Sequence, residues 1–112
     1  MAGTRYLARG LDDGGNVANF VETELILAHK DTLYSFVQIR GSVPLYWQQK
    51  GIQASVTVKR DLEYTAQAFD KHLNDMVNDY RFVIMINLLQ KSRAYEQMLT
   101  NRFEVSYLFT IN

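Results

Sequence analysis

The chain of 112 residues contains no cysteine and a single proline, and its 12 basic and 12 acidic residues leave a formal net charge of zero. Without cysteine it has no thiolate of its own for catalysis or metal binding, and it forms no internal disulfide. Without net charge it has no global field that attracts nucleic acid or anionic lipid. Any anion binding by this chain therefore has to be local.

Long hydrophobic runs are also missing. A membrane-spanning helix needs roughly 18 consecutive apolar residues, and the best candidate, residues 82–89, is short and interrupted by Asn87. The first residues, Met-Ala-Gly-Thr-Arg, lack the apolar stretch of a signal peptide. A hydrophobic content of 47% with 12% aromatics is nevertheless that of a folded protein. We expect a folded chain with no transmembrane segment.

The first half of the sequence has the pattern of antiparallel strands separated by turns. Residues 11–15 contain Asp-Gly and Gly-Gly, which favour a tight hairpin turn. Aromatic and β-branched residues on either side favour β structure. The pattern predicts a β-meander whose strands cover residues 4–9, 16–28, 33–39 and 54–60.

The second half changes to a helical period. Apolar residues spaced three and four apart predict an amphipathic helix that begins after Thr65 as N-cap and buries Phe69 and Leu73. Residues 82–89 are apolar on both faces and predict a central strand of a sheet. Ser92 is the expected cap of a second helix, with Leu99 and Phe103 on its buried side.

These elements predict a mixed α/β or α+β fold, in which an antiparallel meander precedes a helix–strand–helix piece. A strand apolar on both faces needs a neighbouring strand at each edge. The sequence contains no other strand of that kind. We therefore expect the chain to be a fragment of a larger domain.

Three segments resemble one known family. They are Gly3-Thr-Arg-Tyr-Leu-Ala-Arg-Gly10, Asn16-Val-Ala-Asn-Phe-Val-Glu-Thr-Glu24 and the stretch from Ser35 through Gln38-Ile-Arg-Gly-Ser-Val-Pro44 to Trp47. They resemble the Sac family of phosphoinositide phosphatases, most closely the synaptojanin-type Sac domains. The resemblance runs from about residue 2 to 104. It implies a partial Sac domain with a β-rich part (1–60), an α/β part (61–104) and an atypical tail (105–112).

The resemblance implies hydrolysis of phosphoinositide phosphates at a cytosolic membrane face, in lipid signalling and membrane traffic. Family members attack phosphorus with a cysteine thiolate held in an arginine-containing loop, and need no metal or cofactor for that step. This loop lies C-terminal to the region that the chain matches. We therefore expect no catalytic residue here and no activity of the chain alone. The alternative is a non-catalytic module that binds phosphoinositide head groups or another protein at the membrane periphery, without nucleic acid.

The candidate site is Arg40-Gly41-Ser42, which follows a predicted strand. A guanidinium can bind a phosphate through two N–H groups, and the Ser42 hydroxyl can add a donor. Gly41 is expected to serve the backbone geometry of the turn. A structural alternative stays open, in which Arg40 pairs with Glu22 or Glu24 and orders the sheet.

The remaining polar residues have simpler interpretations. Glu22 and Glu24 share a strand face, but nothing completes an acid–base or metal site around them, so salt bridges or solvent exposure are expected. Asp12 and Asp13 are expected to be turn residues. We expect no catalytic role for the two histidines, of which His72 is placed on the polar side of the first helix. Trp47 is expected to pack over the hairpin, and Arg5 and Arg9 to be solvated or paired.

Overall fold

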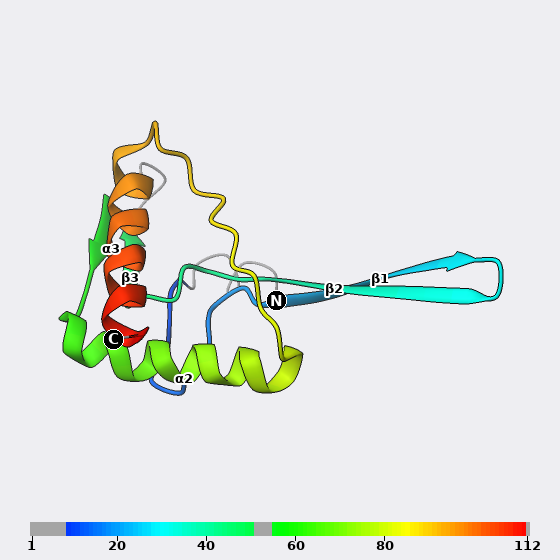
Figure 1. The fold of residues 1–112 in the computed structure, drawn as a ribbon. Helices are drawn as coiled ribbons and strands as arrows, with labels where there is room; N and C mark the ends of the chain where they lie inside the picture. The colour runs from blue at the N-terminus through cyan, green and yellow to red at the C-terminus, as the bar shows by residue number, and fades with distance from the viewer. Residues whose placement is uncertain (1–8, 51–54, 112) are drawn as a thin grey trace.

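The computed structural model describes residues 9–50 and 55–111. In chain order it contains a strand pair, a second strand pair and two helices, packed as Figure 1 shows. The elements are β1 (Val21–His29), β2 (Thr32–Arg40), β3 (Trp47–Lys50), β4 (Ser55–Val58), α2 (Leu62–Tyr80) and α3 (Ala94–Ile111). The predicted α+β class is confirmed, although the described strands form two separate two-stranded antiparallel sheets and not one meander.

Strands β1 and β2 form a long ribbon that projects away from the rest of the molecule (Figure 1). Their register pairs Val21 with Arg40 at the root and His29 with Thr32 at the tip. Lys30 completes the tight turn with a left-handed φ of 53°. The predicted strand 33–39 is confirmed in β2, whereas the strand predicted from residue 16 begins only at Val21, because Val17 forms an isolated bridge with Leu11 and a turn follows it at residues 18–19.

The second sheet pairs Trp47 with Val58 and Gln49 with Val56. Strand β4 corresponds to the predicted strand 54–60, but β3 was not predicted. Its sequence, Trp-Gln-Gln-Lys, is too short and too polar to have a period of its own. The strand exists because β4 pairs with it, and the bond from Lys59 N–H to the Tyr46 carbonyl (2.7 Å) continues the pairing.

Helix α2 begins earlier than predicted. Its N-cap is Asp61, whose carboxylate accepts a hydrogen bond from the Tyr64 backbone N–H (2.8 Å). The prediction that Thr65 caps this helix was wrong. Thr65 is a buried residue of the first turn, and its hydroxyl donates to the Asp61 carbonyl (2.7 Å). Both residue types cap helices well, and the helical conformation of Leu62 gives the position to Asp61.

The core lies where α3 packs against α2 and β4. Phe69 of α2 and Leu99 of α3 are essentially inaccessible to solvent, and the rings of Phe69 and Phe103 lie 5.7 Å apart. The predicted buried side of the second helix is therefore confirmed at Leu99. Helix α3 begins at Ala94, two residues after the expected cap at Ser92.

Residues 10–18 form a loop that covers α2 and the second sheet. Leu11 packs with Tyr46 and Ala68, and its N–H donates to the Leu45 carbonyl (2.9 Å). Gly10 has a φ of +80°, and a Cβ there would lie 2.4 Å from the Leu45 oxygen. The backbone approaches so closely that only glycine fits at this position. The first predicted strand, 4–9, falls almost entirely outside the described residues.

The prediction of a central strand at residues 82–89 was wrong. This segment is an extended connection between α2 and α3 with no strand partner among the described residues. A strand exists only when a second strand completes its backbone hydrogen bonds, and none of β1 to β4 is paired with it. Asn87 instead bonds locally, accepting from the Leu89 N–H and donating to the Thr100 hydroxyl (both 3.0 Å).

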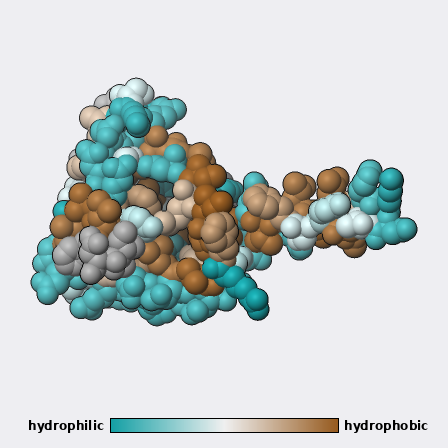
Figure 2. All heavy atoms as spheres, viewed as in Figure 1, coloured by the Kyte–Doolittle hydropathy of each residue, from teal (hydrophilic) through white to brown (hydrophobic). Residues whose placement is uncertain are grey.

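This connection and the shaft of the β1–β2 ribbon expose hydrophobic side chains of their own (Figure 2). Phe82 and Leu88 are each more than four-fifths exposed. Across the described residues, neither helix is apolar over a length that would cross a bilayer.

Candidate functional site

The predicted site, Arg40-Gly41-Ser42, lies at the root of the ribbon, where β2 ends against the 10–18 loop. The Ser42 hydroxyl oxygen accepts a hydrogen bond from the Gly10 N–H (2.8 Å), and the Ser42 N–H donates to the Ala18 carbonyl (2.9 Å). The loop therefore uses one lone pair of Ser42, while its hydroxyl proton has no acceptor in the bonds seen among the described residues. These two hydrogen bonds fix the position of the turn that follows Arg40.

Gly41 is required here by packing. A Cβ at this position would lie only 2.6 Å from the Val17 Cγ2 atom, which is closer than carbon atoms approach without displacement. The loop and the end of β2 can meet at this distance only because residue 41 has no side chain. This agrees with the expectation that Gly41 serves backbone geometry.

Arg40 does not form the ion pair with Glu22 or Glu24 that the sequence left open. It is paired across the ribbon with Val21, whereas Glu22 is paired with Ile39 and Glu24 with Val37. Side chains alternate between the two faces of a strand, so both glutamates lie on the face opposite Arg40. In the described part of the chain the exposed Arg40 guanidinium has no hydrogen bond or ion pair.

The two glutamates have partners of their own. Glu24 accepts a hydrogen bond from the Ser35 hydroxyl (2.6 Å), and Glu22 accepts one from the Tyr80 hydroxyl at the end of α2. The bond to Glu22 raises the pKa of Tyr80 to about 12, because it stabilises the protonated phenol. Glu22 thus ties the root of the ribbon to α2.

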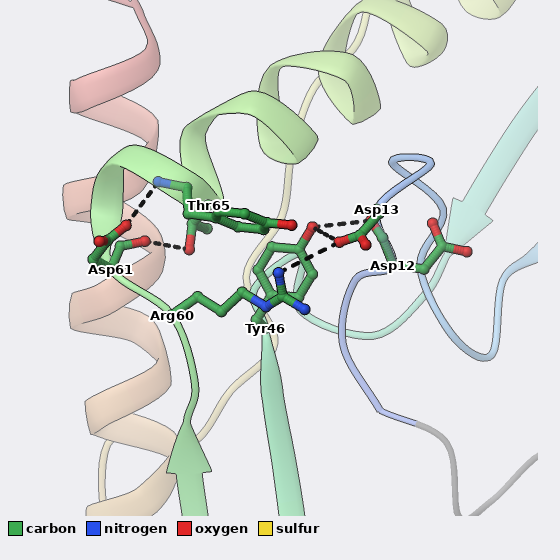
Figure 3. Close-up of polar contacts among 7 residues, drawn as sticks. Asp12, Asp13, Tyr46, Arg60, Asp61 and Thr65 are labelled. Carbon is green, nitrogen blue, oxygen red and sulfur yellow. Dashed lines mark hydrogen bonds and ion pairs between the residues drawn. The ribbon is translucent and has the colours of Figure 1, made fainter.

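A second polar cluster, which the sequence did not predict, surrounds Arg60 at the start of α2 (Figure 3). Its guanidinium carbon lies 4.6 Å from the centre of the Tyr46 ring and 4.3 Å from that of Tyr64. The two rings meet edge to face at 5.7 Å. A guanidinium nitrogen of Arg60 also lies 3.8 Å from Asp13 Oδ1. The cation is held by two aromatic faces and one carboxylate.

Asp13 links this cluster to the N-terminal loop. Its carboxylate accepts a hydrogen bond from the Tyr46 hydroxyl (2.8 Å). Burial, followed by this bond and the charge of Asp13, raises the pKa of Tyr46 to about 12. A phenol with a raised pKa is a hydrogen-bond donor and not a general base at neutral pH. The cluster therefore has the chemistry of binding or structural support.

Beside the two rings is an open hollow of about 340 Å³. Tyr64, Gln67, Ala68 and Lys71 form one side, since residues three, four and seven apart share a helix face. Asp13 and Tyr46 form the other side. The ammonium of Lys71 already pairs with Asp75 (3.1 Å). The sequence predicted a helix after Thr65, but neither this face, which includes Tyr64, nor its meeting with Asp13 and Tyr46 was predicted.

His72 was placed on the polar side of its helix, and this was wrong. It is partly buried, and its Nδ1 lies 3.0 Å from the Gly15 carbonyl oxygen. Burial lowers the pKa of His72, against the smaller raising effects of this bond and of Asp75. Gly15 packs directly on the backbone here, since a Cβ on it would lie 3.1 Å from the His72 nitrogen. The tight loop reaches the helix through this contact.

The structure also places three further residues that the sequence singled out. Asp12 closes its turn by accepting a hydrogen bond from the Asn16 N–H (2.9 Å). The Trp47 indole donates to the Val43 carbonyl (3.1 Å), and its ring lies against Gly10 beside the loop. Arg9 is paired with Gln49 (3.4 Å), and Arg5 lies outside the described residues. Residues 9–50 and 55–111 contain no group of three ligands suited to a metal ion.

Comparison with known proteins gives consistent matches to one family. The model of the SacI homology domain matches residues 1–109. The chain is 50% identical over 111 residues to inositol-1,4,5-trisphosphate 5-phosphatase 1 of Schizosaccharomyces pombe, covering 94% of the chain and 10% of that protein. It is 47% identical over 106 residues to human synaptojanin-1, covering 92% of the chain and 7% of the relative.

A third relative is the polyphosphatidylinositol phosphatase INP53 of Saccharomyces cerevisiae, 42% identical over 115 residues, with 95% of the chain and 10% of the relative covered. The chain thus spans a tenth or less of the length of these relatives. No solved structure matches it.

Proposed function

The chain belongs to the SacI homology domain family, and on this basis we propose that it is part of a phosphoinositide phosphatase. The observation that carries the proposal is the match over residues 1–109, together with 40–50% identity to proteins named as inositol and phosphatidylinositol phosphatases. The substrates are phosphoinositides, and the enzyme acts as a peripheral protein on the cytosolic face of membranes.

In this proposal the nucleophile comes from the parent protein outside these 112 residues, because the printed sequence has no cysteine. The chain alone does not hydrolyse phosphoinositides. It provides scaffold, and Arg40, Gly41 and Ser42 support phosphate binding. Three features favour this role: Arg40 is exposed and has no acceptor in the described part of the chain, Gly41 lets the turn pack tightly, and Ser42 is fixed by two hydrogen bonds.

The test is a chimera in which residues 1–109 replace the matched segment of the S. pombe relative. Phosphate release from phosphoinositide vesicles is measured for the chimera, for its Arg40→Ala variant and for a Lys91→Ala control. Lys91 is an exposed cation in the turn before α3. We expect Arg40→Ala to lower kcat/KM at least tenfold at an unchanged melting temperature, and Lys91→Ala to leave both unchanged. An inactive chimera that melts normally would count against the phosphatase assignment, and equal activity of Arg40→Ala would count against the site.

The second candidate is a non-catalytic module that binds phosphoinositides or another protein, and the lack of cysteine favours it for the chain as printed. The 112-residue chain is sedimented with phosphatidylcholine vesicles that contain or lack phosphatidylinositol monophosphate. Phosphoinositide-dependent sedimentation that is lost in Arg40→Ala supports this function. Equal recovery with both vesicle types contradicts it.

A further inference from the structure

The β1–β2 ribbon presents an apolar surface that nothing in the described residues covers. It extends clear of the helices, and hydrophobic side chains follow its shaft (Figures 1 and 2). The seven large apolar side chains of the shaft are between 41% and 73% exposed. They are Leu25, Ile26, Leu27, Leu33, Tyr34, Phe36 and Val37. Exposed apolar area of this kind marks an interaction surface.

The two edges of the ribbon differ in charge. Each strand has one free edge, since the sheet contains β1 and β2 alone among the described residues. Strand β1 carries Glu22 and Glu24, and charged residues on an edge disfavour pairing with another chain. Strand β2 has no charged residue, proline or glycine from residue 32 to 39. Its edge is therefore the one open to a further strand.

The tip of the ribbon argues against a membrane as the occupant. Residues 29–32 are His-Lys-Asp-Thr, and the tip is hydrophilic in Figure 2. A hairpin that enters a bilayer tip first would have to desolvate these groups, which costs several kcal/mol for each charge. The apolar band lies along the shaft, where a protein strand can lie beside it.

We propose that β2 is a dimerisation edge, along which the β2 strand of a second copy of this chain adds in antiparallel orientation. The strand has nine residues. If the two β2 strands pair over their full length, the two-fold axis passes through the central residue, Phe36. Phe36 then faces Phe36 of the second copy. Leu33 faces its Ile39, and Ser35 faces its Val37. The product is a four-stranded sheet.

This register places apolar side chains opposite one another at Phe36 and at the Leu33–Ile39 pair, which stabilises these cross-strand contacts. The other pairs are uncharged or oppose no like charge. Arg40 at the root lies opposite Thr32 of the second copy, next to the carboxylate of its Asp31. The outer edges of the new sheet are the two β1 strands with their glutamates. A two-fold contact of this type closes at the dimer, and the charged edges oppose further addition.

The test uses the 112-residue chain and measures its mass by sedimentation velocity and light scattering over a range of concentrations. We expect the unmodified chain to form a dimer as concentration rises. Phe36→Lys and Phe36→Glu should each be monomeric, because each places two like charges at the axis. Mixed in equal amounts, the two variants should form a heterodimer, since lysine then faces glutamate. Ile26→Lys is the matched control, with similar exposure on β1 away from the new contact, and it should still dimerise.

Circular dichroism and melting curves show that each variant is folded. A chain that stays monomeric at every concentration overturns the proposal. So does self-association that Phe36→Lys and Ile26→Lys weaken equally, or a Lys–Glu mixture that stays monomeric. If the chain instead floats with plain phosphatidylcholine vesicles and Phe36→Lys abolishes flotation, the surface belongs to a membrane and the proposal is likewise overturned. None of these outcomes depends on phosphatase activity.

Discussion

The imidazole of His72 on α2 and the carbonyl of Gly15 in the N-terminal loop lie 3.0 Å apart, with Nδ1 of the ring toward the oxygen. The two residues are 57 positions apart in the chain. The contact joins the loop that supports Ser42 to the helix that carries the Tyr64–Lys71 hollow. Because the ring is partly buried, its charge state affects the stability of this junction.

We predict that the protein loses stability as the pH falls through the ordinary pKa of histidine. Burial lowers the pKa of His72 in the folded state below the ordinary histidine value of about 6.5, so the unfolded chain binds the proton more readily. The contribution of neutral His72 to the free energy of unfolding is therefore complete above about pH 6.5. It declines as the pH falls from there toward the pKa of His72 in the folded state. Urea unfolding between about pH 8 and pH 5 measures it. His72→Gln should reduce the slope of unfolding free energy against pH, while His29→Gln at the ribbon tip should retain it.

Gly41 provides a test of packing between the loop and β2. Gly41→Ala places a methyl group 2.6 Å from Val17 Cγ2, and overpacking of this kind costs about 1–3 kcal/mol. Val17→Ala removes the clashing methyl groups and should recover part of that loss in the double variant. The measurement is a double-mutant cycle of unfolding free energies. If the two changes are additive, Gly41 does not act through its contact with Val17.

The parts of the fold that sequence alone predicted are those with a local cause. The period of apolar residues in α2 and the β-forming residues of β2 are visible within each segment. The helix start was assigned to Thr65 because both it and Asp61 are good caps, and only the backbone decides between them. Strand β3 and the unpaired residues 82–89 were missed because strand formation depends on a distant partner.

The candidate site divides in the same way. Arg40-Gly41-Ser42 is contiguous, so the sequence was enough to select it. The alternative of an ion pair between Arg40 and Glu22 or Glu24 was not met, because strand register sets the face on which each side chain lies. The observed register places Arg40 and the two glutamates on opposite faces of the ribbon. The cluster of Asp13, Tyr46 and Arg60 combines three distant segments, and no spacing in the sequence connects them.

The N-cap of α2 can be tested directly. Asp61→Ala removes the acceptor of the Tyr64 N–H and should lower stability by about 1 kcal/mol. Asp61→Asn keeps a capping oxygen and should stay near the unmodified protein. Thr65→Ser keeps the hydroxyl that bonds to the Asp61 carbonyl, and should cost less than Asp61→Ala if the cap is Asp61. Melting curves of the three variants order their effects, and a larger loss in Asp61→Asn than in Asp61→Ala would contradict the assignment.

Arg60 combines a stabilising side chain with an unfavourable backbone. Its φ is 143°, a region that costs a non-glycine residue about 1–3 kcal/mol, while the guanidinium contacts Tyr46 and Tyr64. Its carbonyl accepts a hydrogen bond from Arg102 of α3 (3.2 Å), which helps to hold this conformation. Arg60→Ala loses the ring contacts and keeps the strain, so it should lower stability by about 1–2 kcal/mol.

Arg60→Gly loses the same contacts but relieves the strain, so it should be more stable than Arg60→Ala. This reverses the usual order, in which a glycine variant is less stable than the alanine variant by about 0.4–1 kcal/mol, because glycine has more conformational entropy in the unfolded chain. The neighbouring Lys59 has no positive φ and provides the control, where Lys59→Gly should be less stable than Lys59→Ala. Urea unfolding of the four variants measures both orders. The same order at both positions would mean that the backbone of Arg60 is not strained, and that its side chain alone accounts for its effect.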